Sequence, residues 1–156
     1  MRRIDKEINN LQSIESILQE ADHCVIALSH NNSPYMVPMN FGFKDNILYF
    51  HSSPEGRKIE ILKINNKVSF AVQIKTEIVK NKKACNWGMK YMSVIGEGYA
   101  YFIKNNNEKV EALNIIMSKY SDNESNTFEY SETALNNVTL IKVEVNQLKG
   151  KISGYK

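Results

Sequence analysis

Segments in which apolar and polar side chains alternate dominate this chain, and such alternation predicts β-strands. The clearest case is residues 35–43, where Tyr35 and every second residue after it are apolar or aromatic. Successive side chains of a strand point to opposite faces of a sheet, so this pattern gives the strand an inner and an outer face. By the same reasoning, strands are expected at residues 24–28, 35–43, 47–50, 68–74, 91–102 and 138–145.

Three other segments show the spacing of helices. Asp5 is expected to cap a first helix that ends near Glu20. A short helix is expected from Arg57 to about Ile64, and a longer one around residues 110–120, followed by a polar loop at 121–126. The apolar stripe of the first helix comprises Ile8, Leu11, Ile14, Ile17 and Leu18, and that of the last comprises Val110, Leu113, Ile116, Met117 and Tyr120.

The order of these elements limits the fold class. Turn residues at 30–34 and 44–46 join consecutive strands in hairpin order. Hairpin order with few helices argues against a doubly wound parallel sheet and favours an α+β fold, an antiparallel sheet or barrel with helices around it. Gly96 and Gly98 predict a bulge or bend in the long strand. No repeat or linker divides the chain, so a single domain spanning 1–156 is expected.

Composition and charge exclude several classes of protein. Of the 156 residues, 42% are hydrophobic and 24% charged, and no apolar run is long enough to cross a membrane. No secretory signal follows Met1, so a cytoplasmic protein is expected. Cys24 and Cys85 lack the spacing of metal ligands and are expected to be free thiols. The net charge is +3, and the basic run at 80–83 has no interleaved aromatics, so a solvated loop is favoured over nucleic-acid binding.

Pro38 is the first residue that points to a binding site. Proline cannot donate to a strand ladder and therefore belongs on an edge strand or beside a bulge. The backbone of residues 37–40 would then present unpaired groups to a cleft. An ordinary edge strand, protected from aggregation by its proline, explains the pattern equally well.

Two adjacent cations, Arg57 and Lys58, begin the short helix, where the helix dipole disfavours each of them by about 0.3–1 kcal/mol. Gly56 lets the backbone approach a ligand closely, and a helix N-terminus binds anions. His51 and Ser52 supply further donors just upstream. A phosphate would satisfy all of these groups, although plain solvent exposure also explains them. No Walker loop or GxGxxG motif is present.

The third candidate segment runs from Cys85 through Trp87 to Tyr91 and on to Gly98. Its aromatic side chains can cover a planar ligand or simply serve as core or dimer contacts. His51 is a candidate for chemistry, although a histidine at a strand end is more often structural. No spacing supports a metal site built from His51 with the other histidines or the cysteines.

Taken together, these segments resemble the FMN-binding split-barrel superfamily that includes pyridoxamine 5′-phosphate oxidase, and most closely its nitroimidazole-resistance (Nim) branch. The resemblance covers nearly the whole chain in the right order. The matching stretches are residues 2–8, 35–43, 48–52, 56–58, Cys85, 91–98, 108–113 and 150–151.

The resemblance implies a six-stranded antiparallel split β-barrel with flanking helices that forms a homodimer, with FMN at the subunit interface. It also implies that the strand at 36–40 meets the flavin ring and that the segment at 51–58 holds the phosphate. His51 is the implied catalytic or substrate-facing group. The implied cofactor-binding residues are Met36, Val37, Pro38, Met39, Asn40, His51, Ser52, Gly56, Arg57, Lys58 and Tyr91, of which Tyr91 differs in type from its counterpart in the oxidase.

The function implied by the resemblance is that of an FMN-dependent oxidoreductase. It would reduce a small aromatic acceptor, such as a nitroimidazole, with electrons from a reduced nicotinamide. The chain ends at Lys156, without the C-terminal Arg- and His-containing segment with which the oxidase grips its substrate, and this argues against vitamin B6 oxidation. The alternatives are a non-catalytic flavin- or haem-binding split-barrel module and a structural dimer with an empty site.

Overall fold

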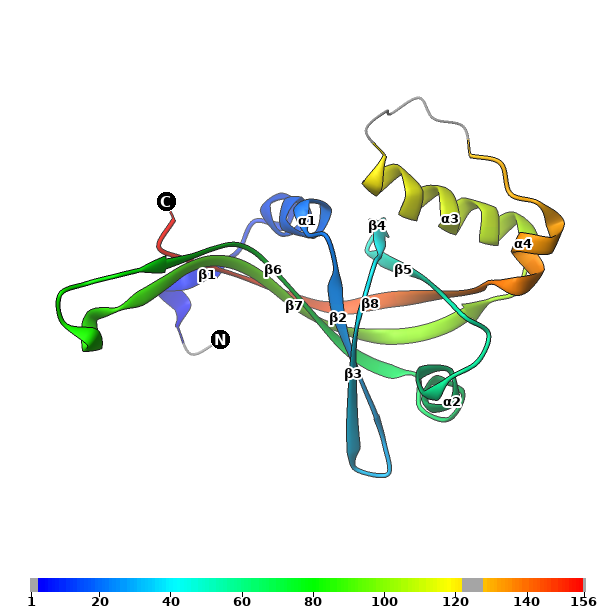
Figure 1. Ribbon diagram of the computed structural model, residues 1–156, viewed down its shortest axis with the longest axis horizontal. Helices are drawn as coiled ribbons and strands as arrows, with labels where there is room; N and C mark the ends of the chain where they lie inside the picture. The colour runs from blue at the N-terminus through cyan, green and yellow to red at the C-terminus, as the bar shows by residue number, and fades with distance from the viewer. Residues whose placement is uncertain (1–2, 122–127, 156) are drawn as a thin grey trace.

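In residues 3–121 and 128–155, which the computed structural model describes, eight strands form one antiparallel sheet and four α-helices pack around it (Figure 1). The strands are β1 (Glu7–Ile8), β2 (Cys24–His30), β3 (Ser33–Met39), β4 (Gly42–Lys44), β5 (Ile47–Ser52), β6 (Lys67–Val79), β7 (Gly88–Ile103) and β8 (Thr139–Ser153). The helices are α1 (Leu11–Glu20), α2 (Arg57–Ile64), α3 (Asn106–Tyr120) and α4 (Glu132–Asn137).

The strand order is β3-β2-β6-β7-β8-β5-β4, and β1 pairs with β8. The two ends of this path, β3 and β4, do not pair with each other within the described residues, so the barrel is split. The expected α+β fold, a six-stranded antiparallel split β-barrel with flanking helices, is therefore confirmed. Six strands have six residues or more, while β1 and β4 are short additions of two and three residues.

The expected start of the first helix was wrong. Asp5 lies in a short 3-10 turn, where its carboxylate accepts two hydrogen bonds from Arg3, and Ile8 belongs to β1. Helix α1 begins only after Asn10, whose side-chain oxygen accepts from the backbone N–H of Ser13. Ile8 in β1 and Ile14 in α1 pack against the same core. The helical spacing of apolar residues therefore continued across the boundary between the strand and the helix.

The expected single strand at residues 35–43 is two strands, β3 and β4, interrupted at Asn40 and Phe41. The backbone N–H of Phe41 donates to the Tyr120 hydroxyl (3.0 Å) instead of to a neighbouring strand. Gly42 allows this segment to lie directly against α3, since a Cβ at that position would lie 2.9 Å from the backbone nitrogen of Ile116.

Other expectations are confirmed. Helix α2 has the expected bounds, and α3 contains the expected long helix. The ladder between β7 and β8 shifts register at Gly98, where a Cβ would lie 2.3 Å from the carbonyl oxygen of Glu144. Both cysteines are free thiols. Helix α4 was not expected, and β6, β7 and β8 extend beyond their expected bounds. The polar loop expected at 121–126 lies outside the described residues after Ser121.

The main core fills the barrel beneath α1 and α2, and a second core cluster lies between the sheet and α3. Phe41, Phe50 and Leu48 are fully buried in the main core. Helix α3 packs on β4 and β5, and in Figure 1 it lies on the same side of the long strands as α1, with β4 between the two helices. Among the described residues no helix is long and apolar enough to cross a membrane.

Candidate functional site

Strand β3 lies at one end of the sheet path, with β2 as its only neighbour on that path, which confirms the edge position expected for Pro38. The two strands are joined by a two-residue turn at Asn31 and Asn32, both with positive φ. The side chains of β3 alternate as expected. Tyr35, Val37 and Met39 are half-buried and pack against the core, while Pro34, Met36 and Pro38 are exposed.

The outer edge of β3 offers mainly acceptors. In an antiparallel ladder, alternate residues direct their backbone groups away from the partner strand. Because His30 and Ser33 flank the two-residue turn, the residues that face away from β2 are Pro34, Met36 and Pro38. Of these three, only Met36 has an N–H group. The edge therefore presents one donor between two prolines, together with three carbonyl oxygens.

The segment that follows β5 leads into an uncapped helix. The Ser52 hydroxyl is buried and donates to the carbonyl oxygen of Ser53 (2.9 Å), whereas His51 is exposed. Gly56 is the N-cap of α2 and has φ 117°, a conformation that favours glycine. Side chains cap the other three α-helices, but α2 has no side-chain cap. Its first N–H groups are therefore available to an anion, beside the cations of Arg57 and Lys58.

A contact between Arg57 and Tyr35 joins this helix to β3. The guanidinium carbon of Arg57 lies 4.8 Å from the centroid of the Tyr35 ring. A stacked guanidinium keeps its N–H groups free in its own plane, where they can donate to a phosphate or carboxylate. This contact brings the start of α2 next to β3. The role of Tyr35 was missed, because its place in the alternating pattern marked it only as an inward-facing residue.

A hollow of about 350 Å³ lies beside Arg57, between the β2–β3 turn and α2. Its lining combines donors from His30 and Ser33 with the carboxylate of Glu60 and the apolar side chains of Ile61 and Ile64. His51 and Lys58 do not line it. Of the two cations at the start of α2, Arg57 therefore borders this hollow and Lys58 does not.

Tyr91 lies apart from the other candidate residues. It belongs to β7, which β2 and β6 separate from β3, and its ring lies 5.2 Å from the Lys151 amine nitrogen. It also faces an irregularity in β6, where the register shifts between Ile74 and Glu77 and Lys75 has a positive φ. No contact within the described part of the chain joins Tyr91 to β3 or α2.

Two residues that the sequence did not single out hold the end of β3 in place. The Tyr120 hydroxyl donates to the carbonyl oxygen of Asp22 (2.8 Å) while it accepts from Phe41. The Lys119 amine donates to the carbonyl oxygen of Leu18 (2.7 Å) and lies 3.2 Å from the Phe41 ring centroid. Burial lowers the pKa of Lys119 to about 8. No local sequence signal marks these contacts, because their partners are far away in the chain.

In residues 3–121 and 128–155, no three His, Cys, Asp or Glu side chains lie close enough together to hold a metal ion. The chemistry that the site offers is that of an anion-binding helix start beside a strand edge.

Comparisons with known proteins identify relatives with the same fold. A search of curated proteins found no match. A solved protein with a proposed role in 5-nitroimidazole antibiotic resistance, from Bacteroides thetaiotaomicron, is 39% identical. The match covers 94% of this chain and 86% of that one, with a TM-score of 0.83.

Two further structures share the fold at low identity. The flavocytochrome Anf3 from Azotobacter vinelandii is 17% identical over 99% of this chain and 72% of its own, with a TM-score of 0.85. An FAD- and haem-binding protein from Mycobacterium smegmatis is 15% identical over 96% of this chain and 74% of its own, with a TM-score of 0.86. The family model for pyridoxamine 5′-phosphate oxidase matches residues 10–152. The chain therefore belongs to the pyridoxamine 5′-phosphate oxidase family.

Proposed function

We propose that this protein is an FMN-dependent oxidoreductase of the Nim type, which reduces a small aromatic acceptor with electrons from a reduced nicotinamide. The observation that carries the proposal is the start of α2, where an uncapped helix and two cations lie beside the open edge of β3. A dianionic phosphate is a good partner for such a group of donors. FMN, when bound, supplies the redox chemistry.

The residues at the start of α2 have distinct tasks in this proposal. The N–H groups of the first turn and the side chains of Arg57 and Lys58 hold the phosphate. Tyr35 keeps the Arg57 guanidinium in one plane. Gly56 provides the backbone turn at the uncapped N-terminus. The Ser52 hydroxyl donates to the carbonyl oxygen of Ser53, so the donor expected from Ser52 is not free for the phosphate in this arrangement.

The edge of β3 is suited to the polar rim of a flavin ring. The Met36 N–H and the carbonyl oxygens of Pro34, Met36 and Pro38 can pair with the hydrogen-bond acceptors and the donor of that rim. His51 is exposed at the end of β5, and in this proposal it faces the acceptor while the start of α2 holds the phosphate. Its role would be to donate a proton to the acceptor as it is reduced, a task that suits imidazole near neutral pH.

A homodimer with FMN at the interface is part of the proposal. The outer face of β7 exposes three large side chains, Ile95 (59% exposed), Tyr99 and Tyr101, with Glu97 between the first two. Met36, on the same side of the sheet by strand register, is 67% exposed. Contiguous apolar surface of this kind typically marks an interface. A second copy covers it by presenting the same face, as twofold symmetry requires.

The acceptor is proposed by analogy with the 39% identical relative, whose name links it to 5-nitroimidazole resistance. A nitroimidazole is a small, planar and electron-poor aromatic, which makes it a suitable electron acceptor for a reduced flavin. The alternative is a flavin- or haem-binding module without catalysis. What favours it is the exposed His51 side chain, free of hydrogen bonds within the described residues and therefore able to ligate iron.

A visible spectrum of the purified protein tests the proposal. We expect a yellow protein that contains FMN, loses its colour anaerobically with a reduced nicotinamide and regains it when a 5-nitroimidazole is added. The double variant Arg57→Ala/Lys58→Ala should bind FMN at least tenfold more weakly, because charge-assisted hydrogen bonds are lost. Lys63→Ala, in the last turn of the same helix, is the control and should leave the affinity unchanged. A protein that takes up neither FMN nor FAD would contradict the proposal.

A further inference from the structure

The hollow beside Arg57 follows one face of α2 along the whole length of the helix. The helix residues that line it are Arg57, Glu60, Ile61 and Ile64, which have the spacing of a single helix face. The β2–β3 turn lines the other side. From Arg57 to Ile64 the helix advances about 10 Å, at about 1.5 Å per residue. The hollow is therefore elongated, and each group on α2 has a fixed place along it.

The chemistry of the hollow changes in a definite order along α2. Arg57 is the first residue of the helix and contributes a cation, and Glu60, about one turn later, contributes a carboxylate. Ile64 is the last residue, and its side chain is 68% exposed. Ile61 is buried between the two ends. A ligand that fills the hollow thus meets a cation, then a hydrogen-bond acceptor, then an uncovered apolar side chain.

The two charged side chains do not neutralise each other. Arg57 and Glu60 are three residues apart, a spacing at which ion pairs form on a helix. Among the described residues, however, Glu60 has no ion pair or side-chain hydrogen bond, and the Arg57 guanidinium lies over the Tyr35 ring instead (4.8 Å from its carbon to the ring centroid). The carboxylate and the N–H groups of the guanidinium are therefore both available to a ligand.

The order of groups in the hollow matches that of a nucleotide, in which phosphate, ribose and base follow one another. Arg57 can donate to phosphate oxygens, the Glu60 carboxylate can accept from ribose hydroxyls, and Ile64 can pack against the base. The planar fork of Arg57 has five N–H groups, enough for the flavin phosphate and a second phosphate. Lys58 does not line the hollow and is left to the flavin phosphate. A volume of about 350 Å³ lies within the usual range of small-molecule sites.

We propose that the hollow binds the adenosine diphosphate half of the reduced nicotinamide donor, and that Glu60 selects NADH over NADPH. The inference rests on the proposed function, which supplies the flavin and the need for a donor. In NADH the ribose next to adenine has a free 2′-hydroxyl, which donates to a carboxylate. In NADPH a phosphate occupies that position and would lie against the negative charge of Glu60. Arg57 cannot offset this repulsion, because it lies about one turn away and is engaged by the other phosphates.

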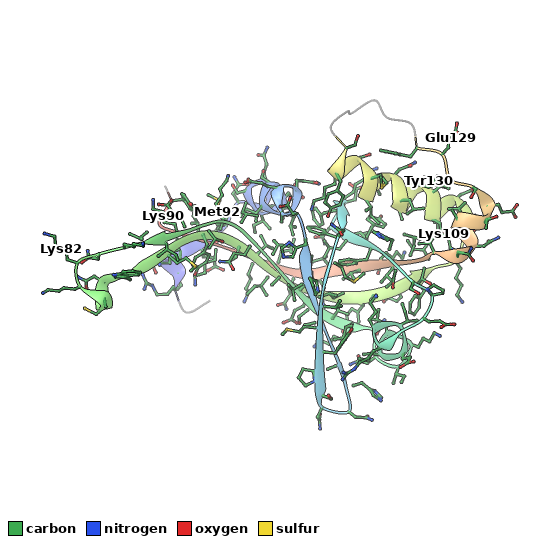
Figure 2. All side chains as sticks on the ribbon, viewed as in Figure 1. Lys82, Lys90, Met92, Lys109, Glu129 and Tyr130 are labelled. Carbon is green, nitrogen blue, oxygen red and sulfur yellow. The ribbon has the colours of Figure 1, made fainter. Side chains whose placement is uncertain are left out.

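Anaerobic flavin reduction by the FMN-loaded protein tests the selectivity. The wild type should have a kcat/KM for NADH at least about tenfold above that for NADPH, since a hydrogen bond to a charged group is exchanged for repulsion. Glu60→Gln keeps the shape of the side chain but removes its charge, so most of this preference should be lost, mainly through KM. The control is Glu129→Gln, which removes an exposed carboxylate that Figure 2 shows near α3 and away from α2, and it should keep the preference.

A binding measurement tests the hollow without electron transfer. The probes are ADP-ribose and its 2′-phosphate, titrated by calorimetry into the protein with oxidised FMN bound. ADP-ribose should bind about tenfold more tightly than its 2′-phosphate, and Glu60→Gln should remove most of this difference. Ile64→Ser should weaken both probes, whereas Lys63→Ser, a change at the neighbouring residue outside the hollow, should weaken neither. The high exposure of Ile64 makes a general loss of structure unlikely to accompany its replacement.

Several results would overturn the inference. Equal use of NADH and NADPH by the wild type, or a preference that Glu60→Gln leaves intact, would show that Glu60 does not face the ribose. A protein purified with FAD that binds ADP-ribose only after the flavin is removed would assign the hollow to the adenosine of the flavin itself. A flavin-loaded protein that neither nucleotide reduces would refute the donor.

Failure of the proposed function can be told apart from failure of this inference. If the wild type takes up no flavin, the proposed function fails, and ADP-ribose titrated into the flavin-free protein then decides about the hollow. Binding that discriminates against the 2′-phosphate through Glu60 would support it as a nucleotide site. No binding of either probe would contradict it.

Discussion

Tyr120→Phe removes a single oxygen atom at the point where the site strand is fastened to the rest of the fold. The hydroxyl of Tyr120 accepts from the backbone N–H of Phe41 (3.0 Å) and donates to the carbonyl oxygen of Asp22 (2.8 Å). The ring itself remains in the variant, so no cavity forms. What the change tests is whether this hydroxyl holds the break between β3 and β4 in place.

The expected cost follows from burial. Phe41 is fully buried, so its N–H loses its partner without ready access to water, and an orphaned buried donor costs about 1–3 kcal/mol. Tyr120 is 39% exposed, which lets water reach the Asp22 carbonyl. We therefore expect a loss of about 1–2 kcal/mol in the free energy of unfolding, or about 2–4 °C in Tm for each kcal/mol in a chain of this size.

Urea unfolding at one fixed protein concentration measures this loss, since the stability of the proposed dimer would depend on concentration. The control is Tyr155→Phe, which removes a hydroxyl that donates to the carbonyl oxygen of Lys75 (2.7 Å) at an exposed site. Water replaces that bond, so a change below about 0.5 kcal/mol is expected. Equal stability of the two variants, with unchanged m-values, would refute the reasoning. FMN affinity should fall in Tyr120→Phe alone, because Phe41 directly follows the strand at 36–40.

Three further predictions concern other parts of the chain. Burial lowers the pKa of Lys119 from 10.5 to about 8, so between these two pH values the unfolded chain binds more protons than the folded chain. The wild type should therefore gain stability relative to Lys119→Met as the pH rises from about 8 to 10.5. Urea midpoints of the two proteins that keep a constant difference over this range would contradict the prediction. Burial raises the pKa of the Cys24 thiol to about 12, whereas Cys85 is exposed. A thiol reagent should therefore react with one cysteine in the native protein and with two in denaturant. Rapid reaction of both cysteines without denaturant would disprove this. Gly56→Ala should lower the free energy of unfolding by about 1–3 kcal/mol because Gly56 has a positive φ, although a Cβ there would contact no other atom. Gly88 is equally open but has no positive φ, so Gly88→Ala should change stability by less than about 0.5 kcal/mol. Similar unfolding curves for the two variants would contradict the prediction.

The sequence predicted those features that depend on neighbouring residues. The alternation of side chains places Tyr35, Val37 and Met39 inward and Pro34, Met36 and Pro38 outward, because the period of a strand is local geometry. The bounds of α2 follow from Gly56 and the breaker at Asn65 in the same way. The cations at the start of α2 were noticed because they oppose a local rule, the preference of the helix dipole for anions.

The boundaries and contacts that the sequence missed depend on residues far apart in the chain. Whether the strand at 35–43 is continuous depends on Tyr120, 79 positions after Phe41, which takes the N–H that a ladder would otherwise use. The contact between Arg57 and the Tyr35 ring depends on the curvature of the split barrel, which brings α2 next to β3. The sequence alone thus determined which side chains face the core and which stretch can hold an anion, because periodicity and capping act over a few residues. Only the tertiary structure decided which strand edge meets that stretch and which side chains line the hollow beside α2, because both depend on how distant segments pack.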